Sequence, residues 1–382
     1  MYKSLINKIH YKLFGYVVLR PKSKSRGYAL LSYISSPFTT LPWQKHTDPH
    51  SNYWEATKIA DILLEKNFTV HVIDWNNTKF LPCKPYQICI DINKNLKRLS
   101  GQLPKNCKKI MHIVSASPTF QNQQEKDRLN FLQKRTGLIL EQKRLESDTQ
   151  NAKYADYIEG FGNSTIRASY DYANKPIFDL PISVTKRYDF NKRDQNLSKN
   201  KFVWFGGGGA ILKGLDLVLE SFAQTQELEL AVIGPIKAES EFYNQFKKYF
   251  DLPNIKLYDR PKIIGDEIIL NNQPLNKFFE NYSFIIYPSA SEGTSGSVVQ
   301  AMHTGLIPIV TKETGLKEDC PAIIIDNIDP NKIIEIIKIQ SNRDSQDLER
   351  LSRQIWEYAN KRHTRQSFEQ AYRAFIDKII YE

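Results

Sequence analysis

Cysteine is scarce in this sequence, and its few copies follow no metal-binding or disulfide pattern. The 382 residues contain four cysteines, Cys83, Cys89, Cys107 and Cys320. None belongs to a C-x-x-C pair, and no spacing among them matches a zinc site or a small disulfide-linked scaffold. The sequence therefore predicts reduced thiols, as in a cytosolic protein, and no metal site.

Long apolar runs are absent as well. No stretch reaches the roughly 18 apolar residues that a membrane-spanning helix needs. The N-terminus also lacks a signal-peptide core followed by a small-residue cleavage site. We therefore expect a cytoplasmic protein that is neither exported nor membrane-spanning.

The N-terminal segment is nevertheless amphipathic. Residues 1–20 place apolar side chains at helical spacing, with lysines and an arginine among them. A basic amphipathic helix of this kind can lie on an anionic membrane surface, which would make the protein peripheral on the inner face of the membrane. The same helix can instead pack its apolar side on the protein itself, and the sequence leaves both arrangements open.

The usual glycine signatures of nucleotide-binding enzymes are missing. A dinucleotide-binding loop needs G-x-G-x-x-G, and a P-loop needs glycine, four residues and then Gly-Lys-Ser/Thr. A run that starts at Gly206 has Ile211 where the third glycine would stand, and Lys213 precedes Gly214 instead of following it. The first strand-to-helix turn, residues 35–39, contains no glycine. Nicotinamide and flavin enzymes are therefore disfavoured.

The sequence does contain enough apolar material for two cores. The chain is longer than one core normally serves, and 41% of it is hydrophobic. Short apolar runs alternate with helical-period segments, which predicts an α/β fold with parallel sheets. Residues 186–201 are polar and charged, as in a linker. We expect two Rossmann-like domains facing each other across a cleft, at residues 1–195 and 196–364, with a C-terminal helix at about residues 365–382 that packs back on the first domain.

Periodicity also predicts the individual elements. In the first half it predicts strands at residues 28–34, 69–74, 109–114, 137–140 and 157–159, and helices at residues 52–66 and around 124–135. In the second half it predicts strands at residues 202–205, 228–233, 284–287 and 307–310, and helices at residues 215–222, 298–303 and about 365–380.

The strongest local signal is a run of four glycines between an apolar strand and an amphipathic helix, KFVWFGGGGAILKGLDLVLESF at residues 201–222. Gly206, Gly207, Gly208 and Gly209 have no side chains, so their backbone N–H groups can approach an anion closely. The following helix presents its positive N-terminal end, and Lys213 adds a full charge nearby. The segment therefore predicts a phosphate-binding site.

A second signal is YPSASEGTSGSVVQAMHTGLIPIV at residues 287–310. Glu292 lies in the loop after a strand, Gly293, Thr294 and Ser295 continue that loop, and Gln300 lies in the helix that follows. Ligands of open α/β sheets bind at the carboxyl ends of the strands. A carboxylate there can accept hydrogen bonds from sugar hydroxyls, and the helix N-terminus behind it can hold phosphate.

With both motifs in place, the chain resembles the retaining GT-B glycosyltransferases of family 4, also called group 1 glycosyltransferases. The resemblance is carried by four blocks: F-G-(x)n-K-G-L-D-x-V-L-E-S-F at residues 205–222, I-G at 233–234, Y-P-S-x-x-E-G at 287–293 and A-M-x-x-G-x-I-P-I-V at 301–310. It implies a hexosyltransferase-type enzyme that moves a sugar from a nucleotide-sugar donor to a hydroxyl of a glycan or lipid-linked acceptor. Retention of configuration, independence of metal and a role in polysaccharide biosynthesis are implied with it.

The resemblance also implies roles for single residues. Lys213 is similar to the lysine that grips the donor diphosphate, and Glu292 to the first glutamate of a Glu-x7-Glu motif that contacts the transferred sugar. Gln300 stands where the second glutamate, a ribose ligand, would be, and its carbonyl can still accept from a hydroxyl. His112, near the end of the strand predicted at residues 109–114, resembles a histidine near the reacting sugar. Members usually carry an arginine where this chain has Gly207 and Gly208.

The charge balance favours anionic partners. Lysine and arginine together number 53 against 42 acidic residues, a net charge of +11. The basic residues are dispersed and no nucleic-acid recognition motif is present, so we expect a nucleotide sugar and not nucleic acid. An inactive or regulatory protein of the same fold is the alternative that Gln300 and the missing arginine leave open.

Overall fold

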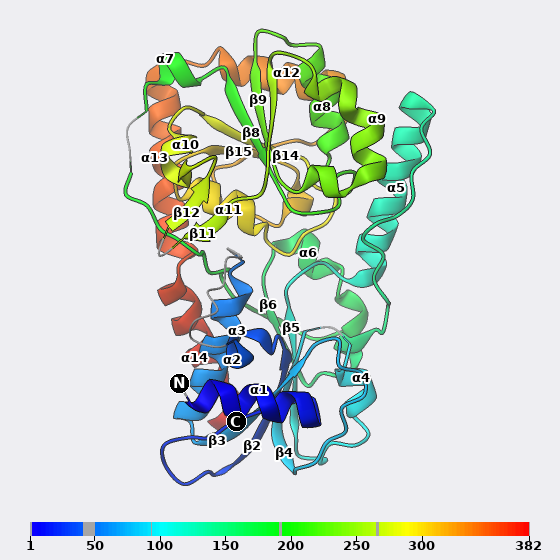
Figure 1. The fold of residues 1–382 in the computed structure, drawn as a ribbon, viewed down its shortest axis with the longest axis vertical. Helices are drawn as coiled ribbons and strands as arrows, with labels where there is room; N and C mark the ends of the chain where they lie inside the picture. Colours follow the sequence, from blue (N-terminus) through cyan, green and yellow to red (C-terminus); the bar gives the residue numbers. More distant parts are fainter. Residues whose placement is uncertain (1, 41–49, 93, 191–192, 265–266, 382) are drawn as a thin grey trace.

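Two lobes, each built on a mostly parallel β-sheet, make up the molecule (Figure 1). The computed structural model describes residues 2–40, 50–92, 94–190, 193–264 and 267–381. The strands of the first sheet come from residues 17–179 and those of the second from residues 201–324. The predicted α/β architecture of two Rossmann-like halves is therefore confirmed.

The first sheet has seven strands in the order β1-β3-β2-β4-β5-β6-β7. They are β1 (Val17–Leu19), β2 (Gly27–Tyr33), β3 (Phe68–Asp74), β4 (Tyr86–Asp91), β5 (Lys108–Ile113), β6 (Tyr157–Gly160) and β7 (Ile177–Asp179). β1 runs antiparallel to β3, and the other neighbours are parallel. Most side chains of β2 to β5 are buried, because helices and loops cover both faces of a parallel sheet.

The segments that connect these strands are mainly helical. They contain α1 (Tyr2–Phe14), α2 (Ser36–Thr39), α3 (Asn52–Glu65), α4 (Leu96–Leu99), α5 (Pro118–Thr136) and α6 (Ser164–Ala168), with 3-10 turns at η1 (Asn151–Tyr154) and η2 (Asp171–Ala173).

The second sheet has six strands, β10-β9-β8-β14-β15-β16, all parallel. They are β8 (Lys201–Phe205), β9 (Glu229–Ile233), β10 (Ile255–Tyr258), β14 (Phe284–Tyr287), β15 (Ile307–Val310) and β16 (Ile323–Ile324). A separate antiparallel sheet contains β11 (Lys262–Ile264), β12 (Glu267–Leu270) and β13 (Gln273–Pro274). β14 and β15 are buried along their whole length, as their unbroken apolar sequence predicts.

Helices of the second lobe follow the strands in turn. They are α7 (Gln195–Ser198), α8 (Leu215–Ala223), α9 (Ser240–Phe250), α10 (Leu275–Phe279), α11 (Gly296–Met302), α12 (Pro330–Ser341) and α13 (Ser345–Arg362), with 3-10 turns at η3 (Ile236–Ala238) and η4 (Lys312–Thr314). α8 begins at Leu215, the residue that the sequence predicts.

The last helix, α14 (Arg365–Tyr381), returns to the first lobe and lies beside α3 (Figure 1). Its N-cap is Thr364, whose Oγ1 accepts a hydrogen bond from the backbone N–H of Ser367 at 2.9 Å. Lys58 of α3 forms an ion pair with Glu369 at 3.2 Å. The C-terminus of the chain thereby ties the two lobes together.

α5 departs most from the expected layout. Although it follows β5 of the first sheet, it lies against the second lobe, beside α8 and α9 (Figure 1). Arg135 of α5 forms an ion pair with Asp216 of α8 at 2.8 Å. The buried Arg128 donates a hydrogen bond to the carbonyl of Pro288 at 2.7 Å. We call α5 and the irregular segment 138–146 that follows it the strap.

The strand predicted at residues 137–140 is wrong. These residues have no regular structure, because the strap carries them away from the first sheet. In the rest of the strap, backbone N–H groups pair with side chains of α5 instead of a neighbouring strand. The N–H groups of Lys143 and Arg144 donate to Glu125, at 2.9 and 3.0 Å, and that of Glu146 donates to Asn122 at 2.8 Å.

The amphipathic helix expected over residues 1–20 is shorter than predicted. α1 ends at Phe14, and residues 17–19 form strand β1 with the buried Val17; Met1 lies outside the described residues. The apolar side chains of α1 face solvent: Leu5, Ile6, Ile9, Leu13 and Phe14 are 43%, 60%, 52%, 70% and 60% exposed. Packing of this face on the protein itself is therefore wrong. No described helix is both long and apolar enough to cross a membrane.

Candidate functional site

A cavity of about 670 Å³ lies between the two lobes, at the carboxyl ends of the strands of the second sheet. Eight of the eleven residues singled out from the sequence line it: Gly206, Gly207, Gly208, Lys213, Glu292, Thr294, Ser295 and Gln300. They come from the loops that follow β8 and β14 and from α11. These two strands are neighbours in the sheet, so two motifs about 80 residues apart meet at one place.

Lys213 and Glu292 are in direct contact. The ammonium nitrogen Nζ of Lys213 lies 2.5 Å from Oε1 of Glu292 and 2.9 Å from the hydroxyl of Tyr287. The Tyr287 hydroxyl in turn donates to Glu292 Oε1 at 3.1 Å, and Ser289 Oγ donates to the same oxygen at 3.2 Å. The two predicted residues therefore share one hydrogen-bonded cluster.

Burial and charge shape the electrostatics of this cluster. Burial alone would lower the pKa of Lys213, but the Glu292 carboxylate and the hydrogen bonds outweigh it and raise that pKa above its ordinary value. Burial, together with the nearby negative charge of Glu292, raises the pKa of Tyr287 to about 12. Lys213 is therefore cationic and Tyr287 is a neutral donor at neutral pH.

The cluster keeps atoms free for a ligand. An ammonium has three N–H donors, and only two described acceptors lie within hydrogen-bond distance of Lys213 Nζ. Oε2 of Glu292 accepts no hydrogen bond from the described residues, since the contacts of its side chain all go to Oε1. One donor and one acceptor therefore remain for a ligand in the cavity.

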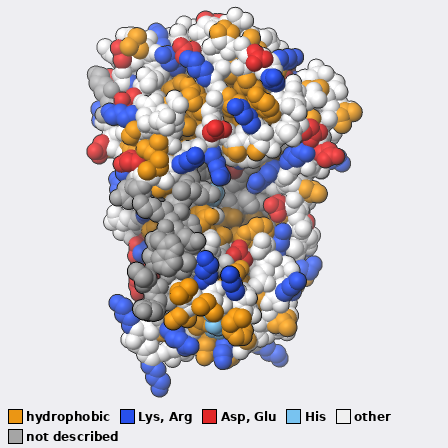
Figure 2. Space-filling model, viewed as in Figure 1, with side chains coloured by type: hydrophobic (Ala, Val, Ile, Leu, Met, Phe, Trp, Pro, Cys, Tyr) orange, Lys and Arg blue, Asp and Glu red, His pale blue; other side chains and the backbone are white. Residues whose placement is uncertain are grey.

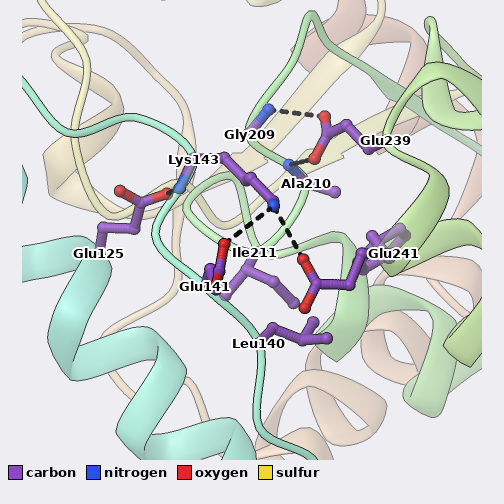
Figure 3. Close-up of a pocket in the computed structure, with 10 residues that line it drawn as sticks. Glu125, Leu140, Glu141, Lys143, Gly209, Ala210, Ile211, Glu239 and Glu241 are labelled. Carbon is purple, nitrogen blue, oxygen red and sulfur yellow. Dashed lines mark hydrogen bonds and ion pairs between the residues drawn. The ribbon is translucent and has the colours of Figure 1, made fainter.

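The glycine loop divides into two parts. Gly206, Gly207 and Gly208 line the cavity, and the N–H groups of Gly207 and Gly208 donate to no acceptor within the described part of the chain. The N–H groups of Gly209 and Ala210 point instead at the Glu239 carboxylate, at 2.7 and 3.1 Å (Figure 3). The amide of Gly209, predicted to bind the donor, is thus occupied by a protein carboxylate.

The loop that carries Glu292 also touches the first lobe. The N–H of Ala116 donates to the backbone carbonyl of Glu292 at 3.0 Å, and the N–H of Gly162 donates to Thr294 Oγ1 at 3.1 Å. Gly293 is packed so closely that an added Cβ would lie 2.4 Å from the Val114 carbonyl oxygen. Gly293 thus acts in this structure at the contact between lobes and does not line the cavity.

Gln300 binds the backbone between the lobes. Its Oε1 accepts from the Lys186 N–H at 3.2 Å, and its Nε2 donates to the Lys186 carbonyl at 2.6 Å. A glutamate could accept the first bond but could not donate the second. Gln300 lines the cavity, so its contact with a ribose stays a prediction beside this structural role.

His112 is not brought to the cavity. It is fully buried, with Nδ1 2.7 Å from Oε2 of Glu159, its register partner on β6. The Glu159 carboxylate offsets the effect of burial and raises the pKa of His112. Its ring lies among Tyr33, Phe161 and Tyr372. His112 does not itself line the cavity, although Tyr33 and Phe161 do, so its position beside the transferred sugar stays a prediction.

Sequence reasoning missed several neighbours of the site. Tyr287 was visible as the first residue of the Y-P-S block but had no assigned role. Glu239 lies about 30 residues from the amides that it binds, and Arg144 reaches the glycine loop from the other half of the chain. No local pattern points to either contact.

Within the described residues, no group of three metal-ligating side chains lies close enough together to hold a metal ion.

The comparisons agree with this architecture. Residues 199–339 match the family model described as Glycosyl transferases group 1, so the resemblance to group 1 glycosyltransferases is confirmed over the residues of the second sheet. No curated protein matches the sequence.

Solved structures of glycosyltransferases share the two-lobed GT-B fold. Sucrose-phosphate synthase from Thermosynechococcus elongatus superposes with a TM-score of 0.64 at 11% identity, over 93% of this chain and 99% of that chain. HepE from Anabaena, in complex with UDP and glucose, gives a TM-score of 0.53 at 10% identity, over 93% of this chain and 100% of that chain. TarM from S. aureus (TM-score 0.49, 13% identity, 75% of this chain) is longer, and the present chain covers 54% of it, about half its length.

Proposed function

We propose that the protein is a retaining, metal-independent, hexosyltransferase-type enzyme, because residues 199–339 match the group 1 glycosyltransferase family model and the chain has a GT-B fold. It moves a sugar from a nucleoside-diphosphate sugar to a hydroxyl of a glycan or lipid-linked acceptor, in the cytoplasm. Support comes from HepE, which shares the fold and was solved with UDP and glucose.

The observation that carries this proposal is the cluster of Lys213 and Glu292 beside the free amides of Gly207 and Gly208. In the proposed reaction the bond from the anomeric carbon to the diphosphate breaks, and its electron pair leaves with the diphosphate. The acceptor oxygen bonds to the same face of the anomeric carbon, and its proton passes to the departing diphosphate. Cations and oriented N–H groups stabilise the negative charge that develops.

A donor screen tests the proposal. Thermal unfolding is measured with UDP, GDP and ADP and with their common sugar conjugates, followed by transfer assays with and without EDTA. A ligand at 100 times its Kd stabilises the folded state by about 2.7 kcal/mol, so one nucleotide should raise the Tm clearly. Transfer should survive EDTA.

The screen also separates the alternatives. Tight nucleotide binding without transfer or donor hydrolysis would favour an inactive or regulatory protein of the same fold. This alternative stays open because the side-chain amide of Gln300 donates to the Lys186 carbonyl. The absence of binding by every nucleotide would count against the proposal as a whole. Loss of transfer in EDTA, restored by Mg²⁺, would contradict metal independence alone.

We further propose that α1 rests on an anionic membrane surface. Figure 2 shows hydrophobic side chains gathered at the lower end of the molecule, where Figure 1 places α1, with lysine and arginine side chains around them. Lys12, Arg20, Lys22 and Lys24 are exposed, and residues 1–47 contain no aspartate or glutamate. Each basic residue near an anionic surface contributes about 1 kcal/mol, and the exposed apolar side chains can enter the interface.

Replacing Leu13 with aspartate should lower binding to vesicles of anionic phospholipid at least about 10-fold, because burial of one leucine is worth about 1.5–3 kcal/mol. Vesicle flotation measures the bound fraction. Leu197→Asp is the matched control, since Leu13 and Leu197 are both 70% exposed but Leu197 lies on α7 of the second lobe. The proposal would be contradicted if the two variants bound vesicles equally well, or if the wild type bound vesicles with and without anionic lipid to the same extent.

A further inference from the structure

Three lysine or arginine side chains of the described residues line the cavity: Lys213, Arg144 and Arg260. The charge of Lys213 is already balanced by Glu292 at 2.5 Å. The guanidinium groups of Arg144 and Arg260 form no ion pair or hydrogen bond with any described residue, and both side chains are exposed. The cavity therefore offers two unpaired positive charges.

Arg144 is the one that touches the glycine loop. Gly209 has a φ of +93°, and a Cβ added there would lie 2.8 Å from Cγ and 3.2 Å from Cδ of Arg144. The aliphatic stem of Arg144 thus crosses the loop directly, while the side chain lines the cavity. Arg260 follows β10, which lies two strands from β8 in the sheet, and is placed farther along the edge.

The backbone of Arg144 is firmly held. Its N–H donates to Oε1 and Oε2 of Glu125, both at 3.0 Å, and its carbonyl accepts from Gln121 Nε2 at 2.8 Å. The preceding Lys143 forms an ion pair with Glu241 of α9 at 2.8 Å (Figure 3). The strap therefore fixes the backbone of Arg144 beside the loop, so that only its side chain has to be ordered when a ligand binds.

The rest of the loop supplies less positive potential than four glycines suggest. Glu239 accepts the N–H groups of Gly209 and Ala210 and adds a negative charge behind the loop. A diphosphate carries at least two negative charges and gains another when it leaves the sugar. Lys213, paired with Glu292, and the amides of Gly207 and Gly208 leave much of that charge unbalanced.

We propose that Arg144 binds the diphosphate of the donor, with its guanidinium at the glycine loop opposite Lys213. A guanidinium fork matches two phosphate oxygens, and Arg144 is the unpaired cation that contacts this loop. Since Arg144 belongs to the strap, which comes from the N-terminal half of the chain, the donor diphosphate contacts both halves. The inference rests on the proposed function, because it names a ligand contact of the same site.

Calorimetric titration tests the inference. The probes are UDP, GDP and ADP, each compared with its nucleoside. The Kd of the nucleoside divided by the Kd of the nucleoside diphosphate measures the contribution of the diphosphate to affinity. For the nucleotide that binds the wild type, Arg144→Ala should reduce this ratio about 10-fold or more. The affinity of the variant should also fall less steeply with added NaCl than the affinity of the wild type. The ratio for Arg144→Lys should lie between those of the wild type and Arg144→Ala, since lysine keeps the charge but lacks the paired N–H donors of the guanidinium.

Lys126→Ala is the matched control. Lys126 is an exposed cation on the same strap, in α5, and does not line the cavity, so its variant should bind as the wild type does. The Arg144 side chain is exposed and its backbone contacts remain in the variant, so Arg144→Ala should keep the wild-type Tm.

The outcomes that overturn the inference are distinct. Suppose that the wild type binds a nucleotide normally. An unchanged Kd ratio in Arg144→Ala, or a larger fall of this ratio in Arg260→Ala than in Arg144→Ala, would then refute the role of Arg144 and leave the proposed function standing. A wild-type protein that binds none of the three nucleotides would refute both.

Discussion

Alanine at position 213 is expected to lower kcat/KM for the nucleotide sugar about 10- to 100-fold. The loss corresponds to about 1.5–3 kcal/mol for one charge-assisted contact to the diphosphate. The same change leaves Glu292, whose side chain is only 18% exposed, without its cation, so the free energy of unfolding should fall as well. Steady-state kinetics and urea unfolding of Lys213→Ala measure the two effects separately.

Glu292→Gln distinguishes binding from transfer. It removes the carboxylate of a residue that lines the cavity but keeps the shape of the side chain, so sugar transfer should fall while nucleoside-diphosphate binding stays nearly intact.

The control for Lys213→Ala is Lys277→Ala, because Lys277 of α10 pairs with Glu280 and is 55% exposed. If Lys213→Ala kept the wild-type kcat/KM, Lys213 would have no part in the mechanism.

Gly293→Ala is expected to open the contact between the lobes. Its Cβ would lie 2.4 Å from the carbonyl oxygen of Val114 and 3.0 Å from the N atom of Ser115, both backbone atoms of the first lobe that cannot rotate away. Overpacking of this kind costs about 1–3 kcal/mol. Because Glu292 precedes this residue, displacing the loop by about 1 Å should lower kcat/KM by up to about 100-fold.

Urea unfolding and small-angle scattering check this prediction, with a larger radius of gyration expected for Gly293→Ala. Gly296→Ala, at the first residue of α11, is the matched control, since its Cβ would meet only Ile182 Cδ1 at 3.6 Å. Its free energy of unfolding should equal or exceed that of the wild type, because alanine is favoured over glycine in a helix. If the two variants unfold alike, the close contact at Gly293 does not hold the lobes together.

Regular elements were largely predictable where local pattern decides them. The strands at residues 284–287 and 307–310 and the start of α8 agree with expectation, because fully apolar runs between turn residues have few alternatives in an α/β fold. The errors occur where a long-range contact decides. Residues 137–140 leave the sheet with the strap, and residues 17–19 pair with β3 instead of extending α1.

The candidate site follows the same division. Lys213 and Glu292 could be named because each follows a strand, and parallel strands bring their carboxyl ends together. His112 lies one residue before the end of β5, but strand position does not say toward which neighbours a side chain turns, and its Nδ1 pairs with the buried Glu159. Neither Glu239 nor Arg144 carries a local signal, since their contacts with the loop depend on α9 and on the strap.

The sequence by itself determined that two α/β halves are present and that a glycine-lysine motif and a glutamate motif follow strands of the second. Local periodicity and strand-end positions are short-range properties, so they can be read without a fold. Only the tertiary structure decided that Lys213 pairs with Glu292, that Glu239 occupies part of the glycine loop, and that Arg144 reaches this loop from the first half. These contacts join residues from 30 to about 80 positions apart, where packing of whole elements sets the partners.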